Sequence, residues 1–404
     1  MDEFGTYAIA LASALTTVAV FLLAIPAACL LVLTVSAVRR SQDRWREPCA
    51  RQDLRVVVLV PAHNESIHLL PTLQCVKGQL RIGDRLIVIA DNCQDDTAAM
   101  ARASGVEVLE RTDAQRRGKG YALAFGVDAL RASPPDVLVV VDADCTLSEG
   151  AVQAVAQRCA QTECPVQMLD LMTAPRGAGL RTRILEFAWL VKNQVRPLGS
   201  FYLGGACHLM GTGMALPWTL ASQHLLASGH IAEDMKLGVD LAIAGRPTQF
   251  LSTSQITSEF PLNAQVARAQ KARWEHGHIT TMSQELPGII TALLHRPSRA
   301  LMVLAMDLVI PPLALYFMCL AVATPILALA YSFNIAFQSA LLLMLLASAA
   351  MLAAVGMAWF RFGKHLLTLR ELITVPLYAA WKLPIYFAYL IQRKSGWTKT
   401  ARKV

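Results

Sequence analysis

Two carboxylates stand two residues apart in the run Asp142-Ala143-Asp144. Carboxylate oxygens suit hard divalent cations such as Mg²⁺ or Mn²⁺, and phosphate oxygens of a bound substrate often complete the metal's coordination shell. The same spacing also occurs by chance in many chains. The pair therefore indicates a candidate metal site that needs support from the rest of the sequence.

A second chemical signal is Lys119, which stands between Gly118 and Gly120 at the start of a predicted helix. A lysine beside glycines at a helix N-terminus is suited to bind a phosphate, and a solvated helix residue is the alternative. Asp91 follows an apolar run, and its carboxylate could accept a hydrogen bond from the ring N–H of a nucleobase. The acidic residues that follow Asp91 would also serve as a helix cap.

The elements that would position these groups alternate between short apolar runs and helical stretches. The runs are nearly continuous, as expected for strands that are buried on both faces. They indicate an α/β unit with parallel strands, whose ligands lie beyond the carboxyl ends of the strands. Each polar cluster falls at such an end or at the helix start. The predicted strands are 55–60, 85–90, 106–110 and 136–141, and the helices include 97–104 and 120–131.

Seven ordered motifs between residues 55 and 280 resemble the family 2 glycosyltransferases, the superfamily of cellulose, chitin and hyaluronan synthases. They are V-P-A-H-N-E at 60–65, D-N-C-Q-D-D-T at 91–97, G-K-G-Y-A-L at 118–123, D-A-D at 142–144, G-T-G-M-A-L at 211–216, A-E-D at 232–234 and Q-K-A-R-W at 270–274. The resemblance implies an α/β GT-A fold, with a Rossmann-like mixed sheet in a cytoplasmic domain. Transmembrane α-helices and interfacial helices would accompany that domain.

The resemblance also implies a donor side and a metal. Glu65 and Asp91 would contact the nucleobase, and Lys119 would lie near the donor. A Mg²⁺ or Mn²⁺ ion would be bound by Asp144, with Asp142 on the ribose or metal side. The full donor-binding set carried over is Pro61, Ala62, Glu65, Asp91, Lys119, Asp142 and Asp144.

On the acceptor side, the resemblance makes Asp234 the general base and Arg273 a second catalytic residue. The acceptor-binding residues carried over are Gly213, Glu233, Gln270 and Trp274. Two departures occur: Ala232 replaces the usual Thr, and Lys271 stands where Gln or Arg is common. Without the family resemblance, Asp234 would be interpreted as an acidic residue that stabilises a helix N-terminus. Trp274 would be interpreted as an aromatic residue packed on a helix.

The expected activity is an inverting, metal-dependent transfer of a hexosyl or N-acetylhexosaminyl group from a nucleotide-sugar, with UDP favoured by the resemblance. The acceptor would be a lipid-linked or surface glycan in polysaccharide or exopolysaccharide biosynthesis. One alternative is a processive synthase that extrudes its polymer. Another is a non-catalytic membrane protein that binds or transports a nucleotide-sugar. A dinucleotide oxidoreductase is disfavoured because no G-x-G-x-x-G follows a strand.

The apolar regions predict a membrane protein. Residues 7–38 carry no charge, whereas about 20 apolar residues suffice to cross a bilayer. An acidic start and a long apolar run argue against a cleaved signal peptide. Residues 300–360 suit two spans that turn near 332–334, and their one charge is Asp307. An acid in a span is a functional candidate, but its nearness to Arg299 favours a place near the headgroups.

The expected organisation is an N-terminal transmembrane helix, a cytoplasmic GT-A domain, an interfacial linker, two transmembrane helices and a basic tail with interfacial or re-entrant helices. In residue numbers these are 1–40, 41–283, 284–299, 300–360 and 361–404. Residues 372–391 carry Lys382, two prolines and basic flanks on both sides, which favours an interfacial segment over a span. We expect a bacterial inner-membrane protein, with homo-oligomers as one option.

The formal net charge of +8 is mostly juxtamembrane, so anionic lipid explains it without nucleic acid. The tail 393–404 is basic, and the simple interpretation is a polybasic segment that lies on anionic lipid. Related synthases, however, carry a mobile loop with an aromatic, a threonine and a basic residue near the C-terminal membrane region. By that resemblance the tail closes over the donor diphosphate through Trp397, Thr398, Lys399 and Arg402.

The topology can be tested directly. Because arginines follow the first apolar run, the positive-inside rule places residue 2 outside and residues 45, 280 and 400 inside. Labelling of single cysteines at these positions, with an impermeant reagent on intact cells, reports the side. A C-terminus found outside would mean that residues 372–391 span the membrane.

Overall fold

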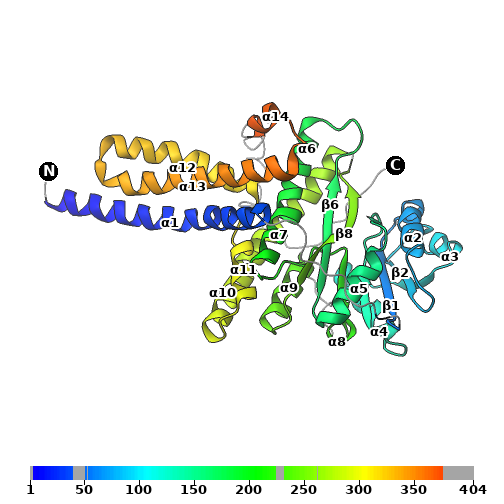
Figure 1. Ribbon diagram of the computed structural model, residues 1–404. Helices are drawn as coiled ribbons and strands as arrows, with labels where there is room; N and C mark the ends of the chain where they lie inside the picture. The colour runs from blue at the N-terminus through cyan, green and yellow to red at the C-terminus, as the bar shows by residue number, and fades with distance from the viewer. Residues whose placement is uncertain (1–2, 40–50, 52, 224–231, 262, 376–404) are drawn as a thin grey trace.

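The computed structural model describes residues 3–39, 51, 53–223, 232–261 and 263–375. Its long helices α1 (Glu3–Arg39), α12 (Leu313–Phe333) and α13 (Gln338–Ala358) run side by side as an arm that leaves an α/β domain (Figure 1). The N-terminal end of α1 lies at the far tip of this arm. The arm thus projects from the domain and contacts it at one end.

The domain is built on one eight-stranded sheet in the order β3-β2-β1-β4-β7-β6-β8-β5. Its first four strands, β3 to β4 in this order, are parallel, while β7 runs antiparallel to both β4 and β6. The sheet is therefore mixed, as the GT-A fold predicts. The strands are β1 (Val56–Ala62), β2 (Arg85–Asp91), β3 (Glu107–Arg111), β4 (Val137–Val140), β5 (Thr146–Leu147), β6 (Val166–Thr173), β7 (Met214–Pro217) and β8 (Gln249–Glu259).

The four predicted strands occur within one or two residues of the expected bounds, because their apolar side chains are buried on both faces of the sheet. Val58 and Val60 pack into one hydrophobic cluster, whereas Val57 and Leu59 pack into another on the opposite face. Helices cover both faces. They include α2 (Leu70–Lys77), α3 (Thr97–Ala103), α4 (Lys119–Leu130), α5 (Ala151–Thr162), α8 (Trp218–Ala221) and α9 (Glu233–Ile243).

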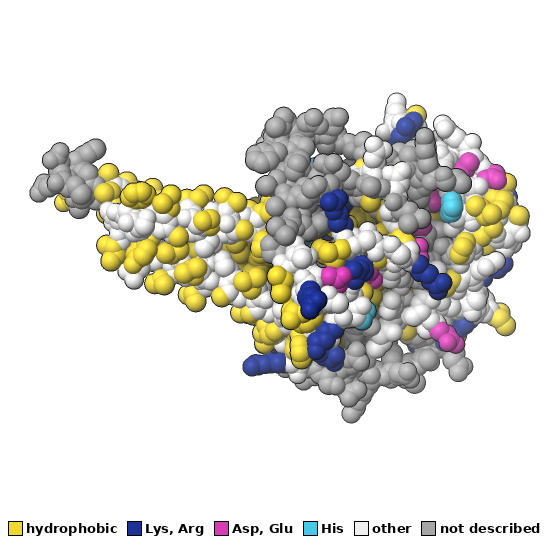
Figure 2. Space-filling model, turned by 90° about the horizontal axis from the view of Figure 1, so that it is seen from above, with side chains coloured by type: hydrophobic (Ala, Val, Ile, Leu, Met, Phe, Trp, Pro, Cys, Tyr) yellow, Lys and Arg dark blue, Asp and Glu magenta, His cyan; other side chains and the backbone are white. Residues whose placement is uncertain are grey.

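Three described helices are long and apolar enough to cross a membrane: Tyr7–Arg39, Leu313–Phe333 and Ile335–Gly363. The face of the arm seen in Figure 2 is covered by hydrophobic side chains, and the charged side chains gather on the domain. This distribution is what a bilayer around the arm requires, because lipid cannot solvate charge. The turn between the second and third candidate spans lies at Asn334, as the sequence predicted.

A continuous helical run connects the arm with the sheet. It consists of α6 (Leu180–Leu190), a π-helical turn (Val191–Val195) and α7 (Arg196–Tyr202). Gly199 of α7 meets the backbone of α1 so closely that an added Cβ would lie 2.1 Å from the carbonyl oxygen of Leu33. Only glycine permits this approach. The arm and the domain are therefore in intimate contact at α7.

Two further helices lie at the junction. Helix α10 (Ala264–His295) is continuous through residue 283, where the domain boundary was expected, and α11 (Arg299–Leu308) precedes the candidate span that begins at Leu313. The short helix α14 (Leu369–Ile373) follows α13. Residues 376–404, with the expected interfacial segment and the gating tail, lie outside the described residues.

Replacing Gly199 by Ala should loosen the joint between α1 and α7. The added methyl cannot fit against the Leu33 backbone, and overpacking of this kind costs about 1–3 kcal/mol of unfolding free energy. We expect a lower thermal unfolding midpoint for the purified protein in detergent.

Gly288→Ala is the matched control, because a Cβ at this helical glycine meets nothing within 4 Å. This variant should unfold at the wild-type temperature or slightly above it, since alanine favours a helix. Equal midpoints for Gly199→Ala and the wild type would show that the joint tolerates the methyl group.

Candidate active site

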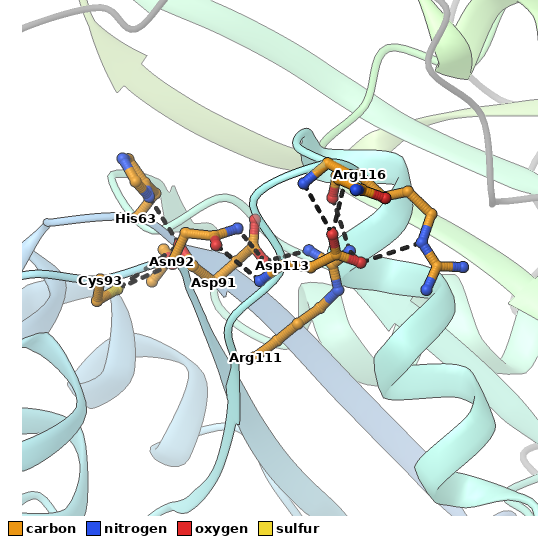
Figure 3. A network of polar contacts seen from close by, with 9 residues as sticks. His63, Asp91, Asn92, Cys93, Arg111, Asp113 and Arg116 are labelled. Atoms are coloured by element: carbon orange, nitrogen blue, oxygen red, sulfur yellow. Dashed lines mark hydrogen bonds and ion pairs between the residues drawn. The ribbon is translucent and has the colours of Figure 1, made fainter.

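The carboxyl edge of the parallel strands carries a row of polar groups. Asp91, at the end of β2, is buried, and its Oδ1 accepts a hydrogen bond from Arg111 Nη1 at 2.6 Å (Figure 3). Arg111 ends β3 and also donates to Asp113 at 3.1 Å. His63 follows β1, with Nδ1 2.7 Å from the Asp91 carbonyl. The expected nucleobase residue Asp91 is thus held by an arginine that the motif comparison did not identify.

The loops along this edge have strained backbones. Asn64, Ser66 and Asn92 adopt positive φ values of 55°, 44° and 53°. Hydrogen bonds hold them: the Thr97 hydroxyl accepts from the N–H groups of Glu65 and Ser66, each at 2.9 Å, and Asn92 Oδ1 accepts from Asp113 N at 2.9 Å. Strain that the surrounding structure sustains in this way is typical of functional sites.

A second group of residues meets around Gly211. The ammonium group of Lys119 forms an ion pair with Asp142 and donates to the Gly211 carbonyl at 2.9 Å. A Cβ at Gly211 would lie 3.1 Å from Asp234 Oδ2 and 3.3 Å from Lys119 Nζ. The φ of Gly211 is +85°, which favours glycine. Residues from α4, the end of β4, the loop before β7 and the start of α9 therefore converge at one point.

This point opens into a cavity of about 210 Å³, here called the polar cavity. Its lining includes six of the predicted catalytic, donor-binding and acceptor-binding residues: Lys119, Asp142, Glu233, Asp234, Arg273 and Trp274. Arg273 and Trp274 come from α10. The Trp274 ring lies 4.7 Å from the Trp189 ring, centroid to centroid, so two indoles form one wall.

Burial shapes the charge of the acids in this cavity. Burial and the nearby charge of Asp234 raise the pKa of Glu233 to about 7. Burial also raises the pKa of Asp234 above its usual range, although the Met235 N–H bonds its Oδ1 at 2.8 Å and opposes the shift. A carboxylate with a raised pKa is a better proton acceptor than an exposed aspartate.

The residues expected to bind a metal suit a hard cation only in part. Asp142 and Asp144 follow the end of β4, and no group of three or more His, Cys, Asp or Glu in the described chain could hold an ion. Two carboxylate ligands leave most of the coordination shell to other oxygens. The oxygens of a diphosphate and of water would fill it, so the donor set fits an ion that binds together with a nucleotide.

The structure separates the other predicted residues. Pro61, Ala62 and Glu65 lie at the end of β1, beside Asp91 and outside the lining of the polar cavity. Gly213 does not line it either: its N–H bonds the Val140 carbonyl at 2.9 Å, and a Cβ would lie 2.6 Å from Ile256. Tight packing in the sheet already requires glycine there, and the acceptor role expected for Gly213 stays a prediction.

Gln270 is also absent from the cavity lining among the described residues, although it lies one turn before Trp274 on α10. Its Oε1 atom is buried without a hydrogen-bond partner in the described structure. The acceptor role expected for Gln270 stays a prediction. The tail residues Trp397, Thr398, Lys399 and Arg402 lie outside the described part of the chain.

Sequence reasoning missed several buried residues that line the polar cavity. Arg196 pairs with Asp307 at 2.6 Å, and both side chains are at most 5% exposed. Burial lowers the pKa of His208 to about 4, so this neighbour of Asp307 is neutral. The sequence favoured a place for Asp307 near the lipid headgroups. In the structure Asp307 is instead the buried ion-pair partner of Arg196. A lone acid in an apolar run was the one available signal.

Beside this pair lie Asp170, Lys192 and Asn193, which also line the cavity. Asn193 donates to Asp170 at 2.9 Å. Burial and the charge of Asp142 raise the pKa of Asp170 to about 7. Lys192 and Asn193 belong to the π-helical turn, an irregularity that is frequent at functional sites.

Comparison with known proteins agrees with this architecture. Residues 54–277 match the family described as "Glycosyltransferase like family 2". A mannosyltransferase from Pyrobaculum calidifontis, solved with GDP-mannose and Mn²⁺, aligns with a TM-score of 0.52 and 16% identity over 95% of this chain and 96% of its own. Glucosyl-3-phosphoglycerate synthase from Mycobacterium tuberculosis, solved with Mn²⁺, UDP and phosphoglyceric acid, aligns with a TM-score of 0.32 and 20% identity over 51% and 74%. No curated protein matches the chain in sequence.

The fold is a GT-A domain joined to helices that could cross a membrane. The family match covers more than half of the chain, and the chain belongs to glycosyltransferase family 2. The family resemblance drawn from the seven motifs is thereby confirmed, while a synthase-type identity stays a prediction.

Replacing Asp144 by Asn should abolish the part of UDP binding that depends on Mg²⁺ or Mn²⁺. A neutral amide oxygen lacks the charge that a hard cation prefers. Calorimetry with UDP, with and without the metal, measures this difference. Asp128→Asn is the control, because Asp128 is 53% exposed on α4 and faces Arg131. Undiminished metal-dependent affinity in Asp144→Asn would remove this residue from the site.

Proposed function

We propose that this chain is an inverting glycosyltransferase that transfers a sugar from a nucleotide-sugar to a hydroxyl acceptor, with Asp234 as the general base. The observation that supports it is the juxtaposition around Gly211. There the partly buried Asp234 carboxylate lies next to the Lys119–Asp142 ion pair, at the wall of a cavity that Arg273 also lines. A base, cations and an open space for substrate therefore meet in one place.

In the proposed reaction the acceptor oxygen attacks the anomeric carbon, and the bond from that carbon to the diphosphate oxygen breaks. Asp234 accepts the hydroxyl proton as the new carbon–oxygen bond forms. The diphosphate leaves with the bonding electron pair. One base with no enzymic nucleophile means a single displacement, so the anomeric configuration inverts, by the same logic as in inverting glycoside hydrolysis.

The negative charge that develops on the leaving diphosphate needs stabilisation by fixed positive groups. Lys119 and Arg273 line the cavity and supply such charge. A Mg²⁺ or Mn²⁺ ion held by Asp142 and Asp144 would add Lewis-acid stabilisation of the diphosphate. Trp274 presents an indole beside Trp189, a surface on which a sugar ring can stack.

We propose a UDP-hexose or UDP-N-acetylhexosamine as donor, and a lipid-linked or surface glycan as acceptor in polysaccharide or exopolysaccharide biosynthesis. The donor is tested by a screen of UDP-glucose, UDP-GlcNAc, UDP-galactose and GDP-mannose. GDP-mannose belongs in it because the Pyrobaculum calidifontis enzyme was solved with that nucleotide-sugar. The catalytic domain would work on the cytoplasmic face of a bacterial inner membrane.

Product length separates single transfer from processive synthesis, because one added sugar contrasts with a ladder of products. Three described helices are candidate spans, and a polymer channel within one chain calls for a larger bundle. This supports single transfer. Release of nucleotide by the purified protein would separate an enzyme from a membrane protein that only binds the donor.

Replacing Asp234 by Asn should leave UDP binding nearly intact and reduce turnover at least about a hundredfold, the lower range for loss of a general base. Nucleotide release in the presence of acceptor measures turnover, and calorimetry measures binding. Asp240→Asn is the matched control on the same helix, since Asp240 is 41% exposed and pairs with Lys236. Turnover within a few-fold of wild type would assign the proton to another group.

Asp234→Asn should also change how the activity depends on pH. Asp234 acts in its ionised form, and its pKa is raised by burial, so activity should fall as the pH drops through this raised pKa. The acid limb should therefore lie at higher pH than that of an ordinary aspartate. The residual activity of Asp234→Asn should lack this limb.

A further inference from the structure

A second cavity lies next to the polar one. It has a volume of about 470 Å³, within the range of about 300–1,000 Å³ of small-molecule sites. We call it the apolar cavity, because most of the side chains around it are hydrocarbon. They come from α6, α10, α12, α13 and α14, and include Leu185, Ala188, Phe317, Met351, Val355 and Leu372.

The two cavities share one wall. Trp189, Lys192, Arg196, Trp274 and His278 line both of them. The two indole rings are in contact, with centroids 4.7 Å apart, and Lys192 Nζ lies 5.3 Å from the Trp189 ring centroid. The apolar cavity is thus polar only where it borders the active site, apart from the paired Lys271 and Glu275 of α10.

Exposed apolar side chains also line the apolar cavity. Leu352 of α13 and Ile373 of α14 line it and are 61% and 69% exposed. The α13 and α12 segments that contribute to it belong to candidate spans. A hydrocarbon chain could therefore enter from the bilayer and remain surrounded by apolar groups up to the two tryptophans.

We infer that the acceptor is a membrane lipid, with its hydrocarbon chain in the apolar cavity and a hydroxyl-bearing head in the polar cavity. This rests on the proposed function and narrows its acceptor class. The layout fits an amphiphile, because the polar cavity next to Asp234 adjoins, through five shared lining residues, an apolar cavity that side chains of two candidate spans also line. A water-soluble glycan would leave the apolar cavity without an occupant.

The nucleophile should be a hydroxyl rather than a phosphate. A hydroxyl must lose its proton as it attacks, which gives Asp234 a task. A lipid phosphate is already ionised at neutral pH and needs no base.

Gly356→Leu tests whether the hydrocarbon chain of the lipid occupies the apolar cavity, and it leaves the catalytic groups unchanged. Gly356 lines the apolar cavity, and a Cβ there meets nothing within 4 Å, so leucine has room to fill the space. The control is Gly288→Leu, a helical glycine of α10 that is equally open and lines neither cavity. Both proteins are reconstituted with liposomes of a bacterial membrane lipid extract and supplied with radiolabelled nucleotide-sugar.

With the wild type and Gly288→Leu, we expect the label to enter the organic phase in a product stable to mild acid, as a glycoside of a hydroxyl is. Gly356→Leu should lower this incorporation about tenfold or more, because leucine displaces at least two methylene groups of the bound chain. Its donor binding and its slow hydrolysis of the donor in the absence of lipid should match the wild type.

Several outcomes would overturn the inference. Equal incorporation by Gly356→Leu and the control would mean that no acceptor chain occupies the cavity. Label found only in a water-soluble glycan would exclude a lipid acceptor, and an acid-labile lipid product would mean a phosphate nucleophile. Wild-type protein that releases no nucleotide from any donor, with or without lipid, would instead contradict the proposed function itself.

Discussion

The buried ion pair between Arg196 and Asp307 is the contact on which the junction of this protein depends. Both charges are almost completely excluded from solvent, and an unpaired charge in such a place costs about 3–5 kcal/mol. Arg196 begins α7, and Asp307 lies near the end of α11. A second bond runs from Arg196 to the Asp307 carbonyl at 2.6 Å. The pair therefore fixes the helix before the first C-terminal span against the helix that receives α1.

The same helical run serves both the membrane arm and the active site. Its α7 part meets α1 through Gly199, while its π-helical turn presents Lys192 and Asn193 to the polar cavity. A one-residue widening of the helix turns these side chains towards the site without ending the helix. One hydrophobic cluster includes Leu33, Val195 and Leu198, so the arm packs directly against this helical run.

The polar cavity concentrates acids whose charges are costly to bury. Asp170 and Glu233 have pKa values raised to about 7, and the pKa of Asp234 is raised as well. Lys119 offsets part of this charge through its ion pair with Asp142. Lys192, Arg196 and Arg273 line the cavity as well, so acidic and basic side chains share its lining.

Sequence by itself determined the parallel half of the sheet, the places of its polar clusters and the three apolar segments long enough to span a bilayer. These features follow from local patterns. A strand that is buried on both faces appears in the sequence as a continuous apolar run, and the polar motif follows where that run ends. Only the tertiary structure decided that Gly211 brings Lys119 and Asp234 together, that Gly213 serves packing, and that Asp307 lies beside the active site. Contacts such as Arg196 with Asp307 join residues 111 positions apart, and no local periodicity encodes them. The apolar cavity likewise exists because α6 and α10 pack beside α12 and α13 at a distance and angle that only the folded chain sets.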